Sequence, residues 1–151
     1  MYLMPKPVEI EISELRKRLR AAIDKSRRAA ADRRVRVDAA SAAYATFLED
    51  KAGPLAHMVA NALRAEGYNF TVFTPAGGVR LSSAKSGDDY LEFALDSAQP
   101  EPAVVLRVNR SRGRRVMQHE RPLREHAPID TLTEEDVLQA LLQEIGPFVE
   151  K

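Results

Sequence analysis

Positively charged side chains are concentrated in two short stretches of this chain, and clustered guanidinium and ammonium groups are suited to binding anions. Residues 16–36 carry ten Lys or Arg against two Asp, and residues 107–115 carry five Arg and no acid. The whole chain has a net charge of only +1, so the remainder is mildly acidic. This asymmetry predicts either an acidic partner or charge-matched self-association.

The second basic stretch is predicted to form the tip of a β-hairpin, with a turn at residues 111–113. A two-stranded ribbon fits a duplex groove, and Arg is the preferred donor to phosphates and guanine edges. The candidate anion, nucleic-acid or partner contacts here are Arg107, Arg110, Arg112, Arg114 and Arg115. The alternative interpretation is an edge hairpin whose charge prevents aggregation through its strands. We favour this alternative because no aromatic residues interleave with the Arg to stack on bases.

The first basic stretch lies in a region that is predicted to be helical. From Ile10 to about Leu48 there is no Gly or Pro, and apolar or small residues recur at nearly helical spacing. The basic residues wind around more than one face, and the candidate contacts among them are Arg27, Arg28, Arg33, Arg34 and Arg36. The few large apolar residues are too little for a membrane-surface helix. Two roles remain for these basic residues: they contact nucleic acid, or they form the solvent-exposed flank of a coiled coil. We favour the solvent-exposed flank.

The length of this helical region has a consequence for assembly. An unbroken helix over residues 10–48 would be about 55 Å long, which exceeds the ~30 Å width of a small body. Part of it would then project or find a partner. Residues 26–36 contain few large apolar groups, so a break around residues 32–38 is the alternative. Three acid–base pairs at i,i+4 spacing lend weak support to the helix: Glu14–Arg18, Asp24–Arg28 and Asp32–Arg36.

The rest of the sequence predicts the α+β class. Gly53-Pro54 is expected to end one helix and open another, which closes at Gly67. Five strands are expected at residues 68–74, 79–83, 90–96, 103–109 and 114–120. Short connections make neighbouring strands antiparallel. A final helix starts at Thr133 with a hydroxyl cap and three carboxylates. We therefore predict a five-stranded antiparallel meander sheet with N-terminal helices and a C-terminal helix packed on one face.

The expected organisation is one α+β domain over residues 1–151. A basic helical region at residues 1–50 projects, and a helix–sheet–helix body occupies residues 54–151. The absence of Cys excludes disulfides, thiolate metal sites and a Cys nucleophile, and it fits a cytoplasmic location. No apolar stretch approaches the roughly 20 residues of a membrane span. Residues 1–7 lack the pattern of a secretory signal.

Motifs for catalysis or cofactor binding are not recognised. His57, His119 and His126 are too scattered to form a metal-ligand set. The turn at residues 74–78 lacks the Lys and Ser/Thr of a phosphate-binding loop. No Ser occupies a nucleophile-elbow context. We therefore assign no catalytic residue, cofactor or metal, and we favour a non-enzymatic function over an enzyme.

Three functional hypotheses follow. The leading one is a binding or assembly protein that forms a homo-oligomer, most simply a dimer, through its N-terminal helical region. The first helix would pair with its copy or with residues 121–151, which carry seven acids against three bases. The second hypothesis is nucleic-acid binding by the Arg-rich hairpin and the basic helix together. The third is a small-ligand carrier or an enzyme, which requires a pocket between sheet and helices.

Overall fold

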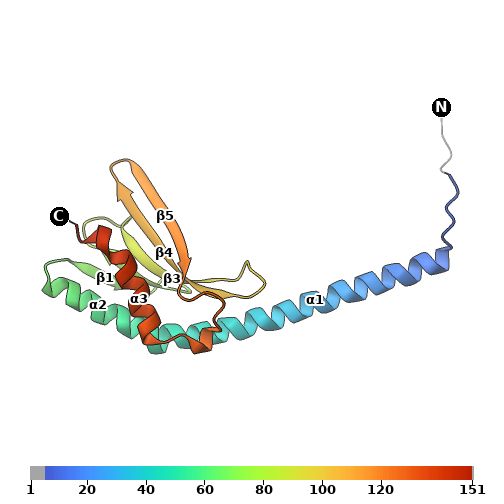
Figure 1. The fold of residues 1–151 in the computed structure, drawn as a ribbon, viewed down its shortest axis with the longest axis horizontal. Helices are drawn as coiled ribbons and strands as arrows, with labels where there is room; N and C mark the ends of the chain where they lie inside the picture. Colours follow the sequence, from blue (N-terminus) through green and yellow to red (C-terminus); the bar gives the residue numbers. More distant parts are fainter. Residues whose placement is uncertain (1–5, 151) are drawn as a thin grey trace. The chain divides into compact units, whose positions relative to one another are not determined.

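The computed structural model describes residues 6–150, and its helices and strands follow the predicted α-α-β-β-β-β-β-α order (Figure 1). The chain forms two compact units, Met1–Val35 and Arg36–Lys151. Each unit is described by itself below. Among the described helices, none combines the length and the apolar composition that crossing a bilayer requires.

Helix α1 runs without a break from Ile12 to Phe47. The alternative of a break around residues 32–38 is therefore wrong. The Ala-rich sequence without Gly or Pro explains the continuity, because Ala has the highest helix propensity and the two excluded residues have the lowest. Of the three expected i,i+4 ion pairs only Glu14–Arg18 forms, with 3.1 Å between Arg18 Nε and Glu14 Oε1.

A single turn of π-helix, η1 (Leu48–Ala52), joins α1 to helix α2 (Gly53–Ala65). The predicted boundary at Gly53-Pro54 is confirmed, because Gly53 caps η1 and begins α2, and Gly53 itself keeps a right-handed helical conformation. Pro54 lies in the first turn of α2, as predicted. A Cβ at position 53 would lie 2.8 Å from the carbonyl oxygen of Leu48, so this turn needs a glycine. The predicted cap at Gly67 is confirmed by its φ of 93°.

The five predicted strands form one antiparallel sheet in which each strand pairs with the next along the chain. The second and third strands have the predicted bounds, and the other three differ by one to three residues at an end. The strands are β1 (Phe70–Phe73), β2 (Val79–Ser83), β3 (Tyr90–Asp96), β4 (Ala103–Arg112) and β5 (Arg115–Pro122).

The hairpin of β4 and β5 is longer than predicted. Its strands pair as far as Arg112 opposite Arg115, so the turn consists of Gly113 and Arg114. Gly113 has a φ of 62° and Arg114 has no positive φ, which is the combination of a two-residue type II′ turn. Because β3 pairs with β4 only as far as Asn109, the hairpin continues beyond the sheet as a two-stranded ribbon (Figure 1). We call residues 110–117 the Arg ribbon.

Helix α3 (Glu134–Ile145) begins at the predicted cap. The hydroxyl of Thr133 accepts from the backbone N–H of Asp136, and the carboxylate of Asp136 accepts from the backbone N–H of Thr133. Val137 and Leu141 of its predicted apolar face are buried. Leu142, also expected on this face, is exposed. One face of a helix presents only three or four residues to the core in two turns, and Leu142 lies outside it.

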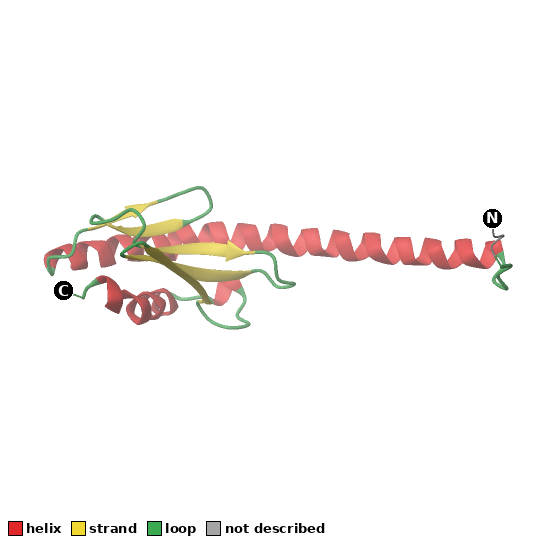
Figure 2. Ribbon diagram, turned by 90° about the horizontal axis from the view of Figure 1, so that it is seen from above, coloured by secondary structure: helices red, strands yellow, loops and turns green. Residues whose placement is uncertain are grey.

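The hydrophobic core lies on one face of the sheet, as predicted. Inward-facing strand residues pack against the C-terminal end of α1, against α2 and against α3 (Figure 2). Phe47 of α1 meets Phe93 of β3 edge to face, with 6.4 Å between the ring centres. This geometry is favourable for aromatic pairs and fixes the end of α1 on the sheet.

Candidate functional site

The part of α1 in the first unit carries a row of large apolar side chains that are exposed to solvent. The row consists of Ile12, Leu15, Leu19 and Ile23, which are 69%, 55%, 56% and 42% exposed. At about 100° per residue these four lie on one side of the helix. We call them the apolar stripe. Such contiguous exposed apolar surface is uncommon on monomeric proteins and typically marks an interaction site.

Exposed basic side chains follow the apolar stripe along α1. The five predicted contacts on the helix are all exposed; Arg27, Arg28, Arg33 and Arg34 belong to the first unit, and Arg36 begins the second. They point in different directions around α1, as expected from their spacing. Within the described residues of the first unit, the only ion pair is Glu14–Arg18. The unit's own carboxylates therefore leave most of this charge without a partner.

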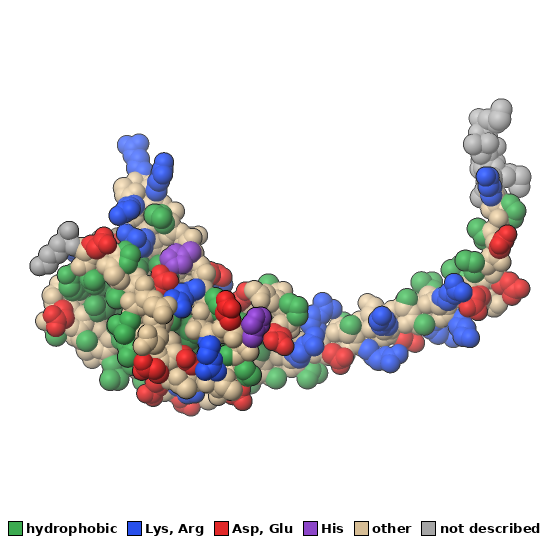
Figure 3. All heavy atoms as spheres, viewed as in Figure 1, with side chains coloured by type: hydrophobic (Ala, Val, Ile, Leu, Met, Phe, Trp, Pro, Cys, Tyr) green, Lys and Arg blue, Asp and Glu red, His purple; other side chains and the backbone are tan. Residues whose placement is uncertain are grey.

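The tip of the Arg ribbon is a second cationic surface. Arg112 and Arg115 are directly opposed across the two strands, and like charges in that position destabilise a strand pair. Neither of them, nor Arg114 in the turn, makes an ion pair with a described residue of its unit. The Arg110 guanidinium lies 5.8 Å from the centre of the Phe148 ring, within cation–π range. Figure 3 shows the resulting gathering of basic side chains at the hairpin tip.

Arg107 differs from the Arg residues at the hairpin tip, because neighbouring carboxylates neutralise its charge. It lies on the open face of the sheet in a row of alternating charges, Arg80, Glu92, Arg107 and Glu120, one from each of four neighbouring strands. Arg80 contacts Glu92 at 3.1 Å, and Arg107 Nε donates to Glu120 at 2.7 Å. This hydrogen bond raises the pKa of Arg107 above its ordinary value. Because the row neutralises itself, Arg107 adds little to the cationic surface.

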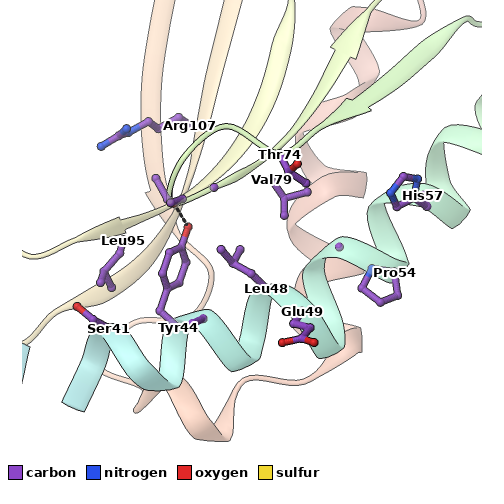
Figure 4. A pocket seen from close by; sticks show the side chains of 15 residues that line it. Ser41, Tyr44, Leu48, Glu49, Pro54, His57, Thr74, Val79, Leu95 and Arg107 are labelled. Carbon is purple, nitrogen blue, oxygen red and sulfur yellow. Dashed lines mark hydrogen bonds between the residues drawn. The ribbon is translucent and has the colours of Figure 1, made fainter. Parts of the chain in front are cut away.

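A pocket of about 940 Å³ lies on the second unit between the helices and the edge of the sheet. We call it the groove. Its walls come from the end of α1, from η1, from the start of α2 and from the strands β2 and β3 (Figure 4). The lining residues are mostly small or apolar: Ser41, Tyr44, Ala45, Leu48, Glu49, Gly53, Pro54, His57, Thr74, Gly77, Gly78, Val79, Ala94, Leu95 and Arg107.

The groove exists because β3 is longer than its neighbour. Strand β2 begins at Val79 opposite Phe93, so the last three residues of β3 have no partner on that side. Leu48 of η1 and Val79 lie on facing walls, while the side chain of Arg107 points away from the space (Figure 4). A Cβ at Gly78 would lie 2.9 Å from the carbonyl oxygen of Phe93. The turn before β2 therefore fits closely over the sheet edge only with glycine there.

Tyr44 is the polar anchor of the groove. It is 5% exposed, and the single hydrogen of its hydroxyl is shared between the carbonyl oxygens of Gly77 at 2.7 Å and Phe93 at 3.1 Å. Burial, with a smaller contribution from Glu92, raises the pKa of Tyr44 to about 12. The side chain therefore remains a neutral hydrogen-bond donor, and it holds the turn above the groove.

The chemistry of the groove favours binding of apolar groups. Glu49, His57 and Arg107 are its titratable side chains besides Tyr44, and no two of the four are hydrogen-bonded to each other among the described residues. A nucleophile with an adjacent base is thus not assembled here. The pocket that the third functional hypothesis requires is present, with a lining suited to aliphatic surface.

Neither the groove nor the π-helical turn is predicted from local patterns in the sequence. The groove depends on the pairing of β2 with β3 and on contacts between α1 and the turn before β2, such as that of Tyr44 with Gly77. The available signal was the pair Gly77-Gly78 after a strand, which was interpreted only as a turn. Gly53, a glycine inside a predicted helical stretch, is a second signal, since the structure shows that a Cβ there would meet the Leu48 carbonyl oxygen.

The three histidines lie apart from one another in different surroundings. His57 lines the groove, His119 Nε2 lies 3.0 Å from Glu144 Oε2 on α3, and His126 occupies a loop with a φ of 54°. Among residues 6–150, no group of three or more His, Asp or Glu is placed to hold a metal ion.

Comparison with known proteins finds no matching family model, no similar curated protein and no similar solved structure.

Proposed function

We propose that this chain is a non-enzymatic assembly protein that self-associates through α1 of its first unit. The observation that carries this proposal is the apolar stripe: four large aliphatic side chains in one row, each more than two-fifths exposed. Burial of such a row in an oligomer removes apolar surface from water, which is the main favourable term in protein association.

The magnitude of this term indicates what else the interface needs. Complete burial of one Leu or Ile contributes about 1.5–3 kcal/mol, so covering four half-exposed side chains contributes on the order of 3–6 kcal/mol. Association costs about 4–15 kcal/mol in lost translational and rotational freedom. The stripe alone thus supports only weak association. A stable oligomer also requires that the surrounding charges attract rather than repel.

Sedimentation velocity of the full chain at micromolar concentration tests the proposal. We expect the wild-type protein to sediment as an oligomer and the Leu15→Ser/Leu19→Ser variant as a single chain. Val35→Ser is the matched control, because Val35 is 68% exposed on the same helix but lies roughly 150° around it from the stripe. A wild-type monomer, or a stripe variant that associates as the wild type does, would contradict the proposal.

Polyanion binding by the Arg ribbon is a second candidate function. The opposed pair of Arg112 and Arg115 supports it, because a like-charged pair at a hairpin tip is unfavourable in the absence of a bound anion. Titration of duplex DNA at several salt concentrations measures this function. The Arg112→Ala/Arg114→Ala/Arg115→Ala variant should lower the salt slope by about 0.9 for each phosphate that the ribbon no longer binds. Lys85→Ala, in an exposed turn of the same unit, should leave the slope unchanged. Equal binding by both variants would exclude the ribbon.

A further inference from the structure

We infer that the apolar stripe of one copy binds in the groove of a second copy. This inference rests on the proposed self-association and identifies the surface that receives α1. The arrangement corresponds to a recurrent mode of recognition, in which the apolar face of an amphipathic helix lies in an apolar groove. Two surfaces that each lack a cover in the described chain would then cover one another.

Charge complementarity favours binding of the apolar stripe to the groove of a second copy over its pairing with the apolar stripe of that copy. Residues 1–35 carry ten bases against five acids, whereas residues 36–151 carry 13 bases against 17 acids. When the four Arg of the Arg ribbon are set aside, the second unit has nine bases against 17 acids. Pairing of two first units would bring two strongly basic helices together. Pairing of a first unit with a second unit of another copy joins opposite charges, which steers association and selects the partner.

Acidic side chains lie next to the groove itself. Glu49 lines the groove and Asp50 follows it in η1, and both are exposed. Lys51 Nζ donates to the Leu132 carbonyl oxygen at 2.5 Å, which holds η1 close to the acidic first turn of α3. Figure 3 shows acidic side chains along the lower edge of the body, where these elements meet.

The basic residues of α1 are placed to meet these acids. Arg16 and Arg20 lie one and five residues after Leu15, so they flank the apolar stripe along its length. Glu49 and Asp50 make no ion pair with a described residue of their own unit. An ion-pair rim around an apolar centre is the usual anatomy of a specific interface.

The dimensions of the two surfaces also agree. The large side chains from Leu15 to Ile23 extend over about 12 Å of helix, and the groove of about 940 Å³ has room for several of them. Half-buried Leu48 and exposed Ala45, which both line the groove, offer aliphatic contact. Tyr44 keeps its hydroxyl satisfied within the protein, so an apolar occupant leaves no buried polar group of Tyr44 unpaired.

Complementation between two variants of the full chain tests the inference. The groove variant is Ser41→Arg/Ala45→Arg, which fills the groove with positive charge at two exposed helix positions. Its matched control is Ala39→Arg/Ala42→Arg, at exposed positions of the same helix outside the groove. The stripe variant is Leu15→Ser/Leu19→Ser. Circular dichroism spectra and unfolding curves establish that each variant keeps the fold.

We expect the groove variant to associate at least about tenfold more weakly than the wild type, since a like charge is placed in the interface. The control should associate as the wild type does. An equimolar mixture of the groove and stripe variants should form a one-to-one complex, because each supplies the intact surface that the other lacks. A groove variant that associates normally while the stripe variant is a single chain would overturn the inference and leave the proposed function standing. A wild-type protein that is a single chain would overturn both.

The sign of the salt dependence gives an independent readout. Screening weakens attraction between opposite charges and relieves repulsion between like charges. Raising the salt from about 0.05 M to about 0.5 M should therefore dissociate the wild-type oligomer if a basic helix binds an acidic body. Tighter association at high salt would overturn the inference in favour of direct pairing of two α1 helices.

Discussion

The two ends of α1 share one sequence pattern and have different surroundings. Near the N-terminus the row of apolar side chains is 42–69% exposed, whereas Tyr44 and Phe47 near the C-terminus are 5% and 3% exposed. Both rows follow helical spacing, so periodicity alone does not distinguish them. The difference is that the second row is covered by the sheet of its own unit. The C-terminal row therefore belongs to the folded core, and the exposure of the N-terminal row is the observation on which the proposed self-association rests.

Removing a large side chain from each row should give the sharpest contrast. Phe47→Ala deletes a buried ring that packs edge to face on Phe93, and we expect it to lower the free energy of unfolding by about 3–5 kcal/mol. Leu19→Ala should leave the unfolding free energy nearly unchanged at concentrations where the protein is a single chain. Urea unfolding monitored by circular dichroism measures both. Equal losses would show that the exposed row is also part of a folded core.

Tyr44→Phe should have an intermediate effect on stability. It leaves the carbonyl oxygens of Gly77 and Phe93 without their hydroxyl donor. A buried polar group left unsatisfied costs about 1–3 kcal/mol. Urea unfolding near neutral pH measures this loss, and Tyr68→Phe is the matched control because no hydrogen bond from its side chain is found among residues 6–150. Equal losses for the two variants would contradict the role of the Tyr44 hydroxyl.

The same residue predicts how stability depends on alkaline pH. The folded protein raises the pKa of Tyr44 to about 12, and an unfolded tyrosine has a pKa of about 10. Its contribution to stability is therefore complete below pH about 10 and is lost as the pH rises toward 12. The wild type should lose more stability over that range than Tyr44→Phe does. Parallel curves for the two proteins would contradict this assignment.

The smallest predicted effect concerns the Arg ribbon. Arg115→Glu converts a repulsive cross-strand pair with Arg112 into an attractive one, and we expect it to raise the unfolding free energy by about 0.2–1 kcal/mol. Arg114→Glu, in the turn without an opposed residue, should give no such gain. Thermal unfolding at low salt provides the comparison. No difference between the two variants would mean that the opposed pair is not repulsive.

Local patterns predicted much of the fold. The turn residues before β2 gave its start, alternation of apolar and polar residues indicated β3, and the hydroxyl and acids at Thr133 gave the start of α3. Short connections between strands predicted the meander. These features depend on residues that are adjacent in the sequence, so they can be predicted from one sequence.

The features that the sequence did not predict depend on long-range packing. The π-helical turn joins two helices that both pack on the sheet, and the groove follows from the unequal lengths of β2 and β3. The hairpin continues past Asn109 because β4 and β5 pair with each other where β3 has ended. Charge clusters were recognised correctly as clusters, but the neutralisation of Arg107 by Glu120 required the strand register.

The mass of the protein in solution tests the central claim most directly. Sedimentation velocity at micromolar concentration and low salt should give an oligomer for the wild type and a single chain for Leu15→Ser/Leu19→Ser. If both proteins sediment as the same species, the exposed apolar row of α1 does not drive assembly, and the proposed function is contradicted.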